Sequence, residues 1–546
     1  MRSKIFCMAW FVMLAGSVGA CGDNIKGDEP QVDAGTDELL KDKVQTIVVI
    51  YAENRGFDNI YGTFPKANGI PGVNPTASGT ISPQIDRDAA GTRLAKLPQS
   101  WGGVTSPGFM PVITQAMSDN LANAPYSFHA TYAGFDLSTI SHDLVHRFFE
   151  NQMQIDGGKN DRFTAFSDVG GLTMGYHDGS SMALWNIARR YVLADNFFMG
   201  AFGGSFLNHQ YLICACAPEY PNADTAAAKP TIAVIDAVGG KYVPSLTLAA
   251  ASPASAIDGP PVFMLTGNLV PKDYFGDQTF RAVNTMQPAY QPSANAPAAT
   301  DASKLYADPA LPNTLPPLAE PTIGDRLDGR GVTWKWYTGS WTSTTATAIG
   351  DRQFPLTGPI ATTTFQFHHQ PFNYYAKFDP QAGTAARQAH LADATQLFTD
   401  VAAGTLPEVV FYKPQGDVNQ HAGYASIEAG DRHIADLIAK LEASPQFAHM
   451  VIVVTYDENG GIWDHVAPPK GDLLGPGTRI PALIISPFAK AGTVDHTQYD
   501  TASIQRLINR RFDLEPLAGV AARDAALMAA GGRPMGDLTN ALDLAQ

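Results

Sequence analysis

Two stretches of the chain share one design: TIVVIYAEN at residues 46–54, and MVIVVTYDE at residues 450–458. Each begins with a short apolar run rich in β-branched residues, which is typical of a strand buried on both faces of a parallel sheet. Residues 409–412 and 480–486 have the same character. Helical patterns alternate with these runs, most clearly at residues 425–443. The sequence therefore predicts an α/β fold with a mostly parallel central sheet and helices on both faces.

Both stretches end in polar side chains that directly follow the apolar run. Glu53 and Asn54 follow the first run, and Asp457 and Glu458 follow the second. Ligands of open parallel sheets gather beyond the carboxyl ends of the strands, so these oxygens could converge on one divalent cation. Without a cation, the carboxylates would raise one another's pKa. The alternative is two ordinary polar turns, and the spacing alone does not choose between them.

A glycine-rich turn precedes a further apolar segment. Gly203-Gly204-Ser205 stands before FLNHQYLI at residues 206–213. Paired glycines let the backbone approach a phosphate, and the amino terminus of a helix offers free N–H donors. Ser205 could attack phosphorus if a metal ion activates its hydroxyl. The alternative is that Ser205 only caps the helix.

Hydrolysis of a phosphate ester also needs donors for the phosphoryl oxygens and a proton for the leaving oxygen. Four histidines lie in loop-like settings flanked by glycine or proline, where function is favoured over packing: His142, His368, His369 and His421. His465 is interpreted as a brace for the loop after Asp457 and Glu458. Six others are interpreted as surface or core residues, namely His129, His146, His177, His390, His433 and His449.

Taken together, these stretches resemble the bacterial phosphoesterase family of acid phosphatases and phosphatidylcholine-type phospholipases C, relatives of the alkaline phosphatase superfamily. The resemblance keeps its order from about residue 46 to residue 517. Its motifs are IYAENRGFD at 50–58, SHD at 141–143, DGGKND at 156–161, GGS at 203–205 with Asn208, WKWY at 334–337, HH at 368–369, KP at 413–414 with His421, TYDENGG at 455–461 and WDH at 463–465. Each motif alone is modest, but their combination and order are specific.

The resemblance implies roles for individual residues. Glu53, Asn54, Asp457 and Glu458 would hold one divalent metal ion, which could be calcium, magnesium, iron or zinc. Ser205 would be the phosphorylated nucleophile, Asn208 would bind substrate, and His142, His368, His369 and His421 would surround the phosphate. Phospholipases of the family commonly have Thr where Ser205 stands, which favours the acid phosphatase branch. Gly56 departs from the family, where Ser is more usual.

We therefore predict a metal-dependent phosphoric ester hydrolase, an acid phosphatase that cleaves small phosphomonoesters through a phosphoserine intermediate. Its activity should fall above the imidazole range, because neutral rings lose their charge on the phosphoryl oxygens. One alternative is a phospholipase C that hydrolyses phospholipid phosphodiesters. A further alternative is an inactive surface-binding lipoprotein of the same fold.

The charge and the first residues bear on partners and location. The chain has 37 Lys and Arg against 52 Asp and Glu, a net charge of −15, which disfavours nucleic acid as a partner. Residues 1–20 have the order of a signal peptide, and Val18-Gly19-Ala20-Cys21 resembles the lipobox of bacterial lipoproteins. We expect a lipidated Cys21, a polar tether over residues 21–43, and a membrane-anchored enzyme in the cell envelope, on the periplasmic side or at the cell surface. An ordinary cleaved signal is the alternative.

The rest of the chain is predicted as one catalytic domain, residues 44–520, with a C-terminal tail at 521–546. Residues 218–321 are rich in Ala, Pro, Ser and Asp, which indicates an insertion that either decorates the surface or covers the substrate. Cys214 and Cys216 are interpreted as small buried residues, because side chains two positions apart on a helix diverge. A disulfide is the minority alternative. The sequence does not indicate an oligomeric state.

Overall fold

The computed structural model describes residues 34–291, 293, 295–303, 305–341 and 365–546. The predicted signal peptide and Cys21 lie outside the described residues, so export and lipidation stay predictions. Within the described ranges, no helix has both the length and the apolar character that crossing a membrane requires.

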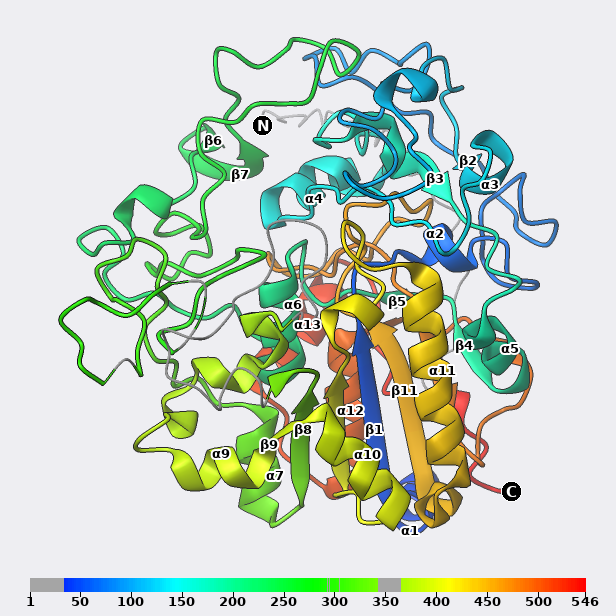
Figure 1. Ribbon diagram of the computed structural model, residues 1–546, viewed down its shortest axis with the longest axis vertical. Helices are drawn as coiled ribbons and strands as arrows, with labels where there is room; N and C mark the ends of the chain where they lie inside the picture. Colours follow the sequence, from blue (N-terminus) through cyan, green and yellow to red (C-terminus); the bar gives the residue numbers. More distant parts are fainter. Residues whose placement is uncertain (1–33, 292, 294, 304, 342–364) are drawn as a thin grey trace, which may run out of the picture.

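An eight-stranded sheet forms the centre of the molecule (Figure 1), in the order β13-β4-β12-β11-β1-β10-β8-β9. The strands are β1 (Thr46–Ala52), β4 (Val192–Ala194), β8 (Trp334–Thr338), β9 (Leu391–Asp393), β10 (Val409–Lys413), β11 (Met450–Tyr456), β12 (Ala482–Ile485) and β13 (Thr493–Asp495). β12 is antiparallel to both of its neighbours, and the other pairs are parallel. The mostly parallel sheet is therefore confirmed. The prediction of a parallel strand at residues 480–486 is wrong, because β12 runs antiparallel to its neighbours. An apolar run indicates a strand that is buried on both faces, but it does not indicate the direction of that strand.

Helices cover both faces of the sheet, as predicted. One layer contains α5 (Ala183–Arg190), α10 (Ala394–Ala403) and α11 (Ile427–Ala443), and the other contains α6 (Ser205–Cys214), α7 (Ile323–Arg330) and α12 (Thr501–Phe512). In Figure 1, α10 and α11 lie in front of the sheet and α12 lies behind it. α11 begins where the Ser426 side chain accepts a hydrogen bond from Ala429 N, and its apolar face, which includes Ile434 and Leu437, is buried.

Shorter elements surround the carboxyl ends of the strands. They are the helices α2 (Phe57–Tyr61), α3 (Phe128–Thr131) and α4 (Phe148–Ile155), and the small strand pairs β2 (Tyr126–Ser127) with β3 (Gly175–Tyr176), β5 (Phe197–Phe198) with β14 (Tyr499–Asp500), and β6 (Ile235–Val238) with β7 (Lys241–Leu246). The helix α9 (Thr384–His390) leads directly into β9, and its His390 stacks on Trp334 at the start of β8. The β6–β7 hairpin belongs to the predicted insertion, which runs between α6 and α7 and is otherwise built mostly of loops (Figure 1).

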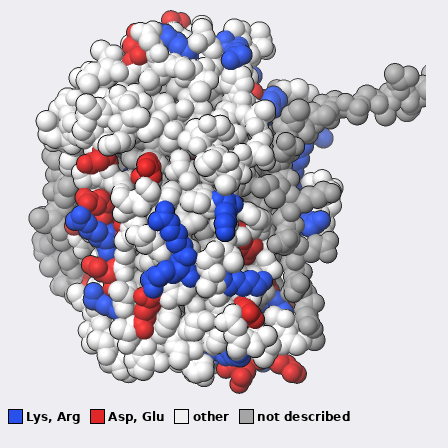
Figure 2. Space-filling view, turned by 90° about the vertical axis from the view of Figure 1, so that its right-hand side faces the viewer, with Lys and Arg blue, Asp and Glu red and all other residues white. Residues whose placement is uncertain are grey.

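Both ends of the described chain pack onto the body more than the sequence indicates. Part of the expected tether forms helix α1 (Ala34–Lys43), in which Leu40 is fully buried. The segment expected as a C-terminal tail contains most of α13 (Ala518–Ala529) and buries Leu527 and Leu538. Lys, Arg, Asp and Glu side chains are interspersed on the face shown in Figure 2, so the net negative charge is not gathered into one patch there.

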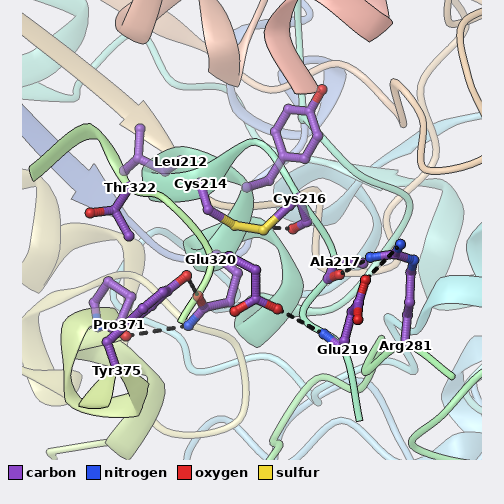
Figure 3. Close-up of a disulfide and its surroundings, with 12 residues drawn as sticks. Leu212, Cys214, Cys216, Ala217, Glu219, Arg281, Glu320, Thr322, Pro371 and Tyr375 are labelled. Carbon is purple, nitrogen blue, oxygen red and sulfur yellow. Dashed lines mark hydrogen bonds and ion pairs between the residues drawn. A yellow bond between two sulfur atoms is a disulfide. The ribbon is translucent and has the colours of Figure 1, made fainter. Parts of the chain in front are cut away.

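Cys214 and Cys216 form a disulfide, with their Cα atoms 5.2 Å apart (Figure 3). The interpretation of two free buried cysteines is wrong, because the two residues do not share a helix. α6 ends at Cys214, and Ala215 caps it in the left-handed conformation (φ 50°). This turn directs Cys216 back toward Cys214.

Candidate active site

Three neighbouring strands bring the first group of site residues together. β1 lies between β10 and β11, and the residues at their carboxyl ends include Glu53, Lys413 and Asp457, all with no exposed surface. Lys413 Nζ lies 2.6 Å from Glu53 Oε1. Asn54 N donates to Asp457 Oδ1 at 3.1 Å, although 403 positions separate the two residues. The two predicted acidic strand ends therefore meet at one edge of the sheet.

Three oxygens face one another at this edge. Asn54 adopts the left-handed conformation (φ 57°), which asparagine tolerates well. Its side-chain oxygen lies 2.9 Å from Glu53 Oε2 and 3.1 Å from Asp457 Oδ1. Three acceptors at such distances repel unless a cation or a proton lies between them. We call Glu53, Asn54 and Asp457 the oxygen site, and its donor set fits a divalent cation.

Two histidines fix the orientation of the Asn54 amide. Asn54 Nδ2 lies 2.9 Å from His421 Nε2 and 3.4 Å from His146 Nε2. The Nδ1 atoms of the two rings contact the carbonyl oxygens of Ala422 and Leu144. Each Nδ1 therefore carries the proton, and each Nε2 accepts. A rotated amide would direct its oxygen at the lone pairs of these nitrogens, so the rings favour the orientation in which Oδ1 faces the carboxylates.

Ser205 lies at the first position of α6, beside Glu458. Ser205 Oγ donates to Glu458 Oε1 at 2.8 Å, and Gly204 N donates to Glu458 Oε2 at 3.1 Å. Gly203 has φ 43°, and a Cβ atom there would lie 2.2 Å from Arg147 O, so the turn requires glycine. The structure thus brings Glu458, predicted as a metal ligand, to the hydroxyl of the predicted nucleophile.

The side chain of Asn208 holds the turn before Ser205 through hydrogen bonds to its backbone. Its Oδ1 accepts from Ala201 N, and its Nδ2 lies within 3.3 Å of the carbonyl oxygens of Ala201, Gly203 and Gly204. The side chain has no exposed surface. In the structure Asn208 holds the turn Gly203-Gly204-Ser205, and substrate binding by this residue stays a prediction.

The tandem histidines lie behind Glu53. His368 and His369 have no exposed surface, and His369 Nε2 is 2.8 Å from Glu53 Oε1. His209, on α6, lies beside them, with ring centroids 5.2 Å and 5.8 Å away. The sequence interpretation gave no role to His209 or Lys413. The signal that could have identified His209 is its position one helical turn after Ser205.

His142 is the one predicted histidine that the structure does not bring to this group. Its Nδ1 contacts Gly103 O at 3.2 Å. His146, which was interpreted as a surface or core residue, is buried and lies beside Asn54, 4.0 Å from Glu458 Oε1. His465 contacts Asp58 Oδ2 at 2.7 Å, next to the loop that it was expected to brace.

Burial sets the charges of the site. Burial and, to a smaller extent, the charge of Glu53 raise the pKa of Asp457 to about 7. Burial and the charge of Asp457 raise the pKa of Glu458 well above its usual range. Burial raises the pKa of Glu53 too, but Lys413 and His369 together outweigh it and hold that pKa well below its usual range. Burial lowers the pKa of every histidine of the group, namely His146, His209, His368, His369 and His421. These shifts favour the neutral form of the rings near pH 7, and the fall of activity above the imidazole range stays a prediction.

A cavity of about 550 Å³ opens over Ser205. His146, His421, Asp143 and Tyr424 line one side of it. The predicted insertion lines the other side with Thr266, Asn268, Asn284, Thr285, Met286 and Asn313. The insertion therefore borders the cavity, whereas His142, His368 and His369 do not line it.

Comparison with known proteins gives the family. The phosphoesterase family model matches residues 44–515. The chain belongs to the phosphoesterase family. Phospholipase C B of Mycobacterium tuberculosis is 22% identical over 535 residues, which cover 92% of this chain and 78% of the relative. The non-hemolytic phospholipase C of Pseudomonas aeruginosa is 26% identical over 228 residues, covering 36% and 30% of the two chains.

Other similarities are shorter or weaker. The non-specific phospholipase C1 of Arabidopsis thaliana is 33% identical over 113 residues, covering 16% of this chain and 21% of the relative. A solved protein in the alkaline phosphatase superfamily from Vibrio parahaemolyticus is 12% identical, covers 37% of this chain and 50% of its own, and has a TM-score of 0.21. The family match confirms the predicted resemblance, and this phosphoesterase is a hydrolase of phosphoester bonds.

One buried carboxyl near the cavity predicts a pH-dependent stability. Glu150 is 1% exposed, and burial raises its pKa from 4.5 to about 7. The folded state binds this proton more tightly than the unfolded state does. The stability that protonation of Glu150 contributes is therefore full below pH 4.5 and is lost as the pH rises through 7. Glu150→Gln removes the titration and should stabilise the protein near pH 8 by about 3 kcal/mol, measured by urea unfolding. Near pH 4 the variant should match wild type.

The exposed Glu515 provides the matched control, because Glu515→Gln should change stability at neither pH. An equal change for Glu150→Gln at both pH values would contradict the account.

Proposed function

We propose that this phosphoesterase is a phosphomonoesterase that uses Ser205 as its nucleophile. The observation that carries the proposal is the position of Ser205 Oγ, which lies 2.8 Å from Glu458 Oε1 and lines the cavity. Most side chains around this cavity are polar, the apolar ones being Leu144, Val145 and Met286. A polar enclosure suits a small, strongly hydrated phosphate ester better than an acyl chain.

The reaction has two steps. Ser205 Oγ attacks phosphorus and passes its proton to Glu458 Oε1, while the bond to the leaving oxygen breaks and that oxygen takes a proton from solvent water. Water then attacks the phosphoserine and releases one proton to solvent, and Ser205 recovers its own proton from Glu458 as the bond from Oγ to phosphorus breaks. Asn208 and the two glycines before Ser205 hold the nucleophile in place, so its alignment needs no rearrangement during the reaction.

A divalent cation fits the oxygen site, and Glu53, Asn54 and Asp457 would hold it. When bound, it would supply positive charge for the phosphoryl oxygens. His146 and His421 would act through Asn54, because their Nε2 atoms accept from its amide and keep Oδ1 directed at the carboxylates.

A phospholipase C is the second candidate, and two observations favour it. The relatives described above are named phospholipases C. In addition, Met110 and Val112 are 74% and 61% exposed. They lie in the loop that follows Val104. Val104 O accepts a backbone hydrogen bond from His142 N, and the residue after His142, Asp143, lines the cavity. Exposed apolar side chains of this kind suit contact with a lipid surface.

Comparing two substrates tests the proposal. We expect kcat/KM for p-nitrophenyl phosphate to exceed that for phosphatidylcholine in vesicles by at least about 100-fold, a difference of roughly 3 kcal/mol in transition-state binding. The double variant Met110→Ser and Val112→Ser should leave turnover of both substrates unchanged. A preference for phosphatidylcholine that the double variant reduces would replace the phosphomonoesterase with a phospholipase C.

A further inference from the structure

The side of the cavity that the insertion between α6 and α7 provides carries no charge. It consists of six half-buried side chains, which we call the insertion wall: Thr266, Asn268, Asn284, Thr285, Met286 and Asn313. The Asp and Arg side chains that line the same cavity, Asp143, Arg147 and Asp168, all precede the insertion in the chain. An uncharged wall rich in amides suits a neutral group that forms hydrogen bonds, rather than an ammonium group or a second phosphate.

Three asparagines of the insertion wall keep polar atoms that the protein does not use. Asn284 Oδ1 accepts from Thr285 N at 2.8 Å, and Asn313 Oδ1 accepts from Asn295 Nδ2 at 3.0 Å. Neither Nδ2 atom donates a hydrogen bond within the described part of the chain, and the side chain of Asn268 makes none there. The wall therefore offers amide N–H donors and, at Asn268, a carbonyl acceptor to a ligand in the cavity.

Gln366 adds an acceptor to the same cavity. Its Nε2 donates to Tyr424 Oη at 2.8 Å, and its Oε1 accepts from none of the described residues. The residue is 4% exposed, so a ligand in the cavity is the natural donor to this oxygen.

Hydrogen bonds hold the insertion wall against the start of α6. Phe206 N donates to Thr285 O at 2.9 Å, and Thr285 Oγ1 donates to His146 O at 2.9 Å. A Cβ atom on Gly204 would lie 3.1 Å from Asn284 O, so the two backbones are in close contact. The wall therefore has a fixed place beside the nucleophile, and the alcohol part of an ester bound there shares the cavity with the amides.

Hydroxyl groups match this set of atoms best. Each hydroxyl donates one hydrogen bond and accepts others, and amides offer both kinds of partner. An alkyl or aryl alcohol would leave the amides unpaired in a space that it shields from water, and a site built on hydrogen bonds discriminates strongly against such a ligand. The cavity volume of about 550 Å³ lies within the usual range of small-molecule sites, about 300–1,000 Å³.

We propose that the insertion wall makes this enzyme selective for phosphomonoesters of polyhydroxylated alcohols, such as sugar and cyclitol phosphates. Asn268, Asn284 and Asn313 are the specificity-determining residues, and Gln366 supports them. The inference rests on the proposed function, because the wall shares its cavity with Ser205. It gives the insertion a role in substrate recognition rather than in surface decoration.

Two esters of matched ring size test the inference. myo-Inositol 1-phosphate and cyclohexyl phosphate each carry one phosphate on a cyclohexane ring and differ in their hydroxyl groups. We expect kcat/KM for the inositol ester to be at least about 30-fold higher. Because hydroxyl groups also make the leaving oxygen more acidic, binding is measured separately. Free myo-inositol should inhibit hydrolysis of p-nitrophenyl phosphate competitively, at a concentration at least about 10-fold lower than cyclohexanol requires.

Substitutions in the insertion wall show which side chains recognise the hydroxyls. Asn268→Ala and Asn313→Ala should each lower the ratio of kcat/KM for the two esters by at least about 5-fold, because each removes a hydrogen-bond partner of a hydroxyl. Asn186→Ala is the matched control, because Asn186 is an exposed residue of α5, and it should keep the wild-type ratio. Circular dichroism shows whether each variant is folded.

The outcomes separate this inference from the proposed function. Hydrolysis of p-nitrophenyl phosphate without a preference for the inositol ester, or a preference that both wall variants retain, overturns the selectivity for polyols alone. No hydrolysis of any phosphomonoester overturns the proposed function and the selectivity with it. The comparison of the two esters uses the wild-type chain, so it does not depend on the folding of any variant.

Discussion

Ser205→Ala should lower kcat/KM for p-nitrophenyl phosphate by at least about 10³-fold, the scale on which loss of a catalytic nucleophile acts in other hydrolases. The alanine lacks the oxygen that attacks phosphorus, and no other hydroxyl is held against Glu458 by a hydrogen bond in the described part of the chain. Steady-state kinetics at saturating metal ion measure the effect. The bound metal should stay, because the oxygen site keeps Glu53, Asn54 and Asp457.

Ser303→Ala serves as the control, because Ser303 is exposed and its loss should leave kcat/KM unchanged. A Ser205→Ala protein that kept full turnover would show that another group attacks phosphorus.

Asp457→Asn should weaken binding of the metal ion by at least about 100-fold and lower turnover with it. Asp457 Oδ1 faces Asn54 and its carboxylate carries half of the negative charge of the oxygen site. Loss of a hydrogen-bond partner behind a metal ligand already costs about 10- to 100-fold in affinity, so loss of the ligand's charge should cost at least about 100-fold. Calorimetric titration of metal-free protein with the divalent ion measures this affinity.

Asp436→Asn, on the exposed side of α11, should bind metal as wild type does. Stoichiometric metal of unchanged affinity in Asp457→Asn would exclude Asp457 as a ligand.

The sequence predicts the framework of the site because the framework obeys a local rule. An apolar run followed by polar residues indicates a strand end, and the parallel sheet then brings Glu53 and Asp457 together. The glycines at 203 and 204 likewise require a special backbone, which φ values of 43° and 81° confirm.

What the sequence does not predict depends on contacts between distant residues. His146 and His142 are four positions apart in the same loop, and only the fold determines that His146 reaches Asn54. His209 and Lys413 lie within apolar elements, where their chemistry looks like packing. The disulfide depends on the helix ending at Cys214, and the termini of helices are less certain from sequence than their centres.

A single measurement addresses the nucleophile, which is the central claim. The protein is mixed with a phosphomonoester, quenched in acid during turnover, digested, and analysed by mass spectrometry. We expect a peptide that carries one phosphoryl group on Ser205 and disappears when substrate is exhausted. Turnover without phosphoserine at Ser205, or with a phosphoryl group on another residue, would contradict this claim.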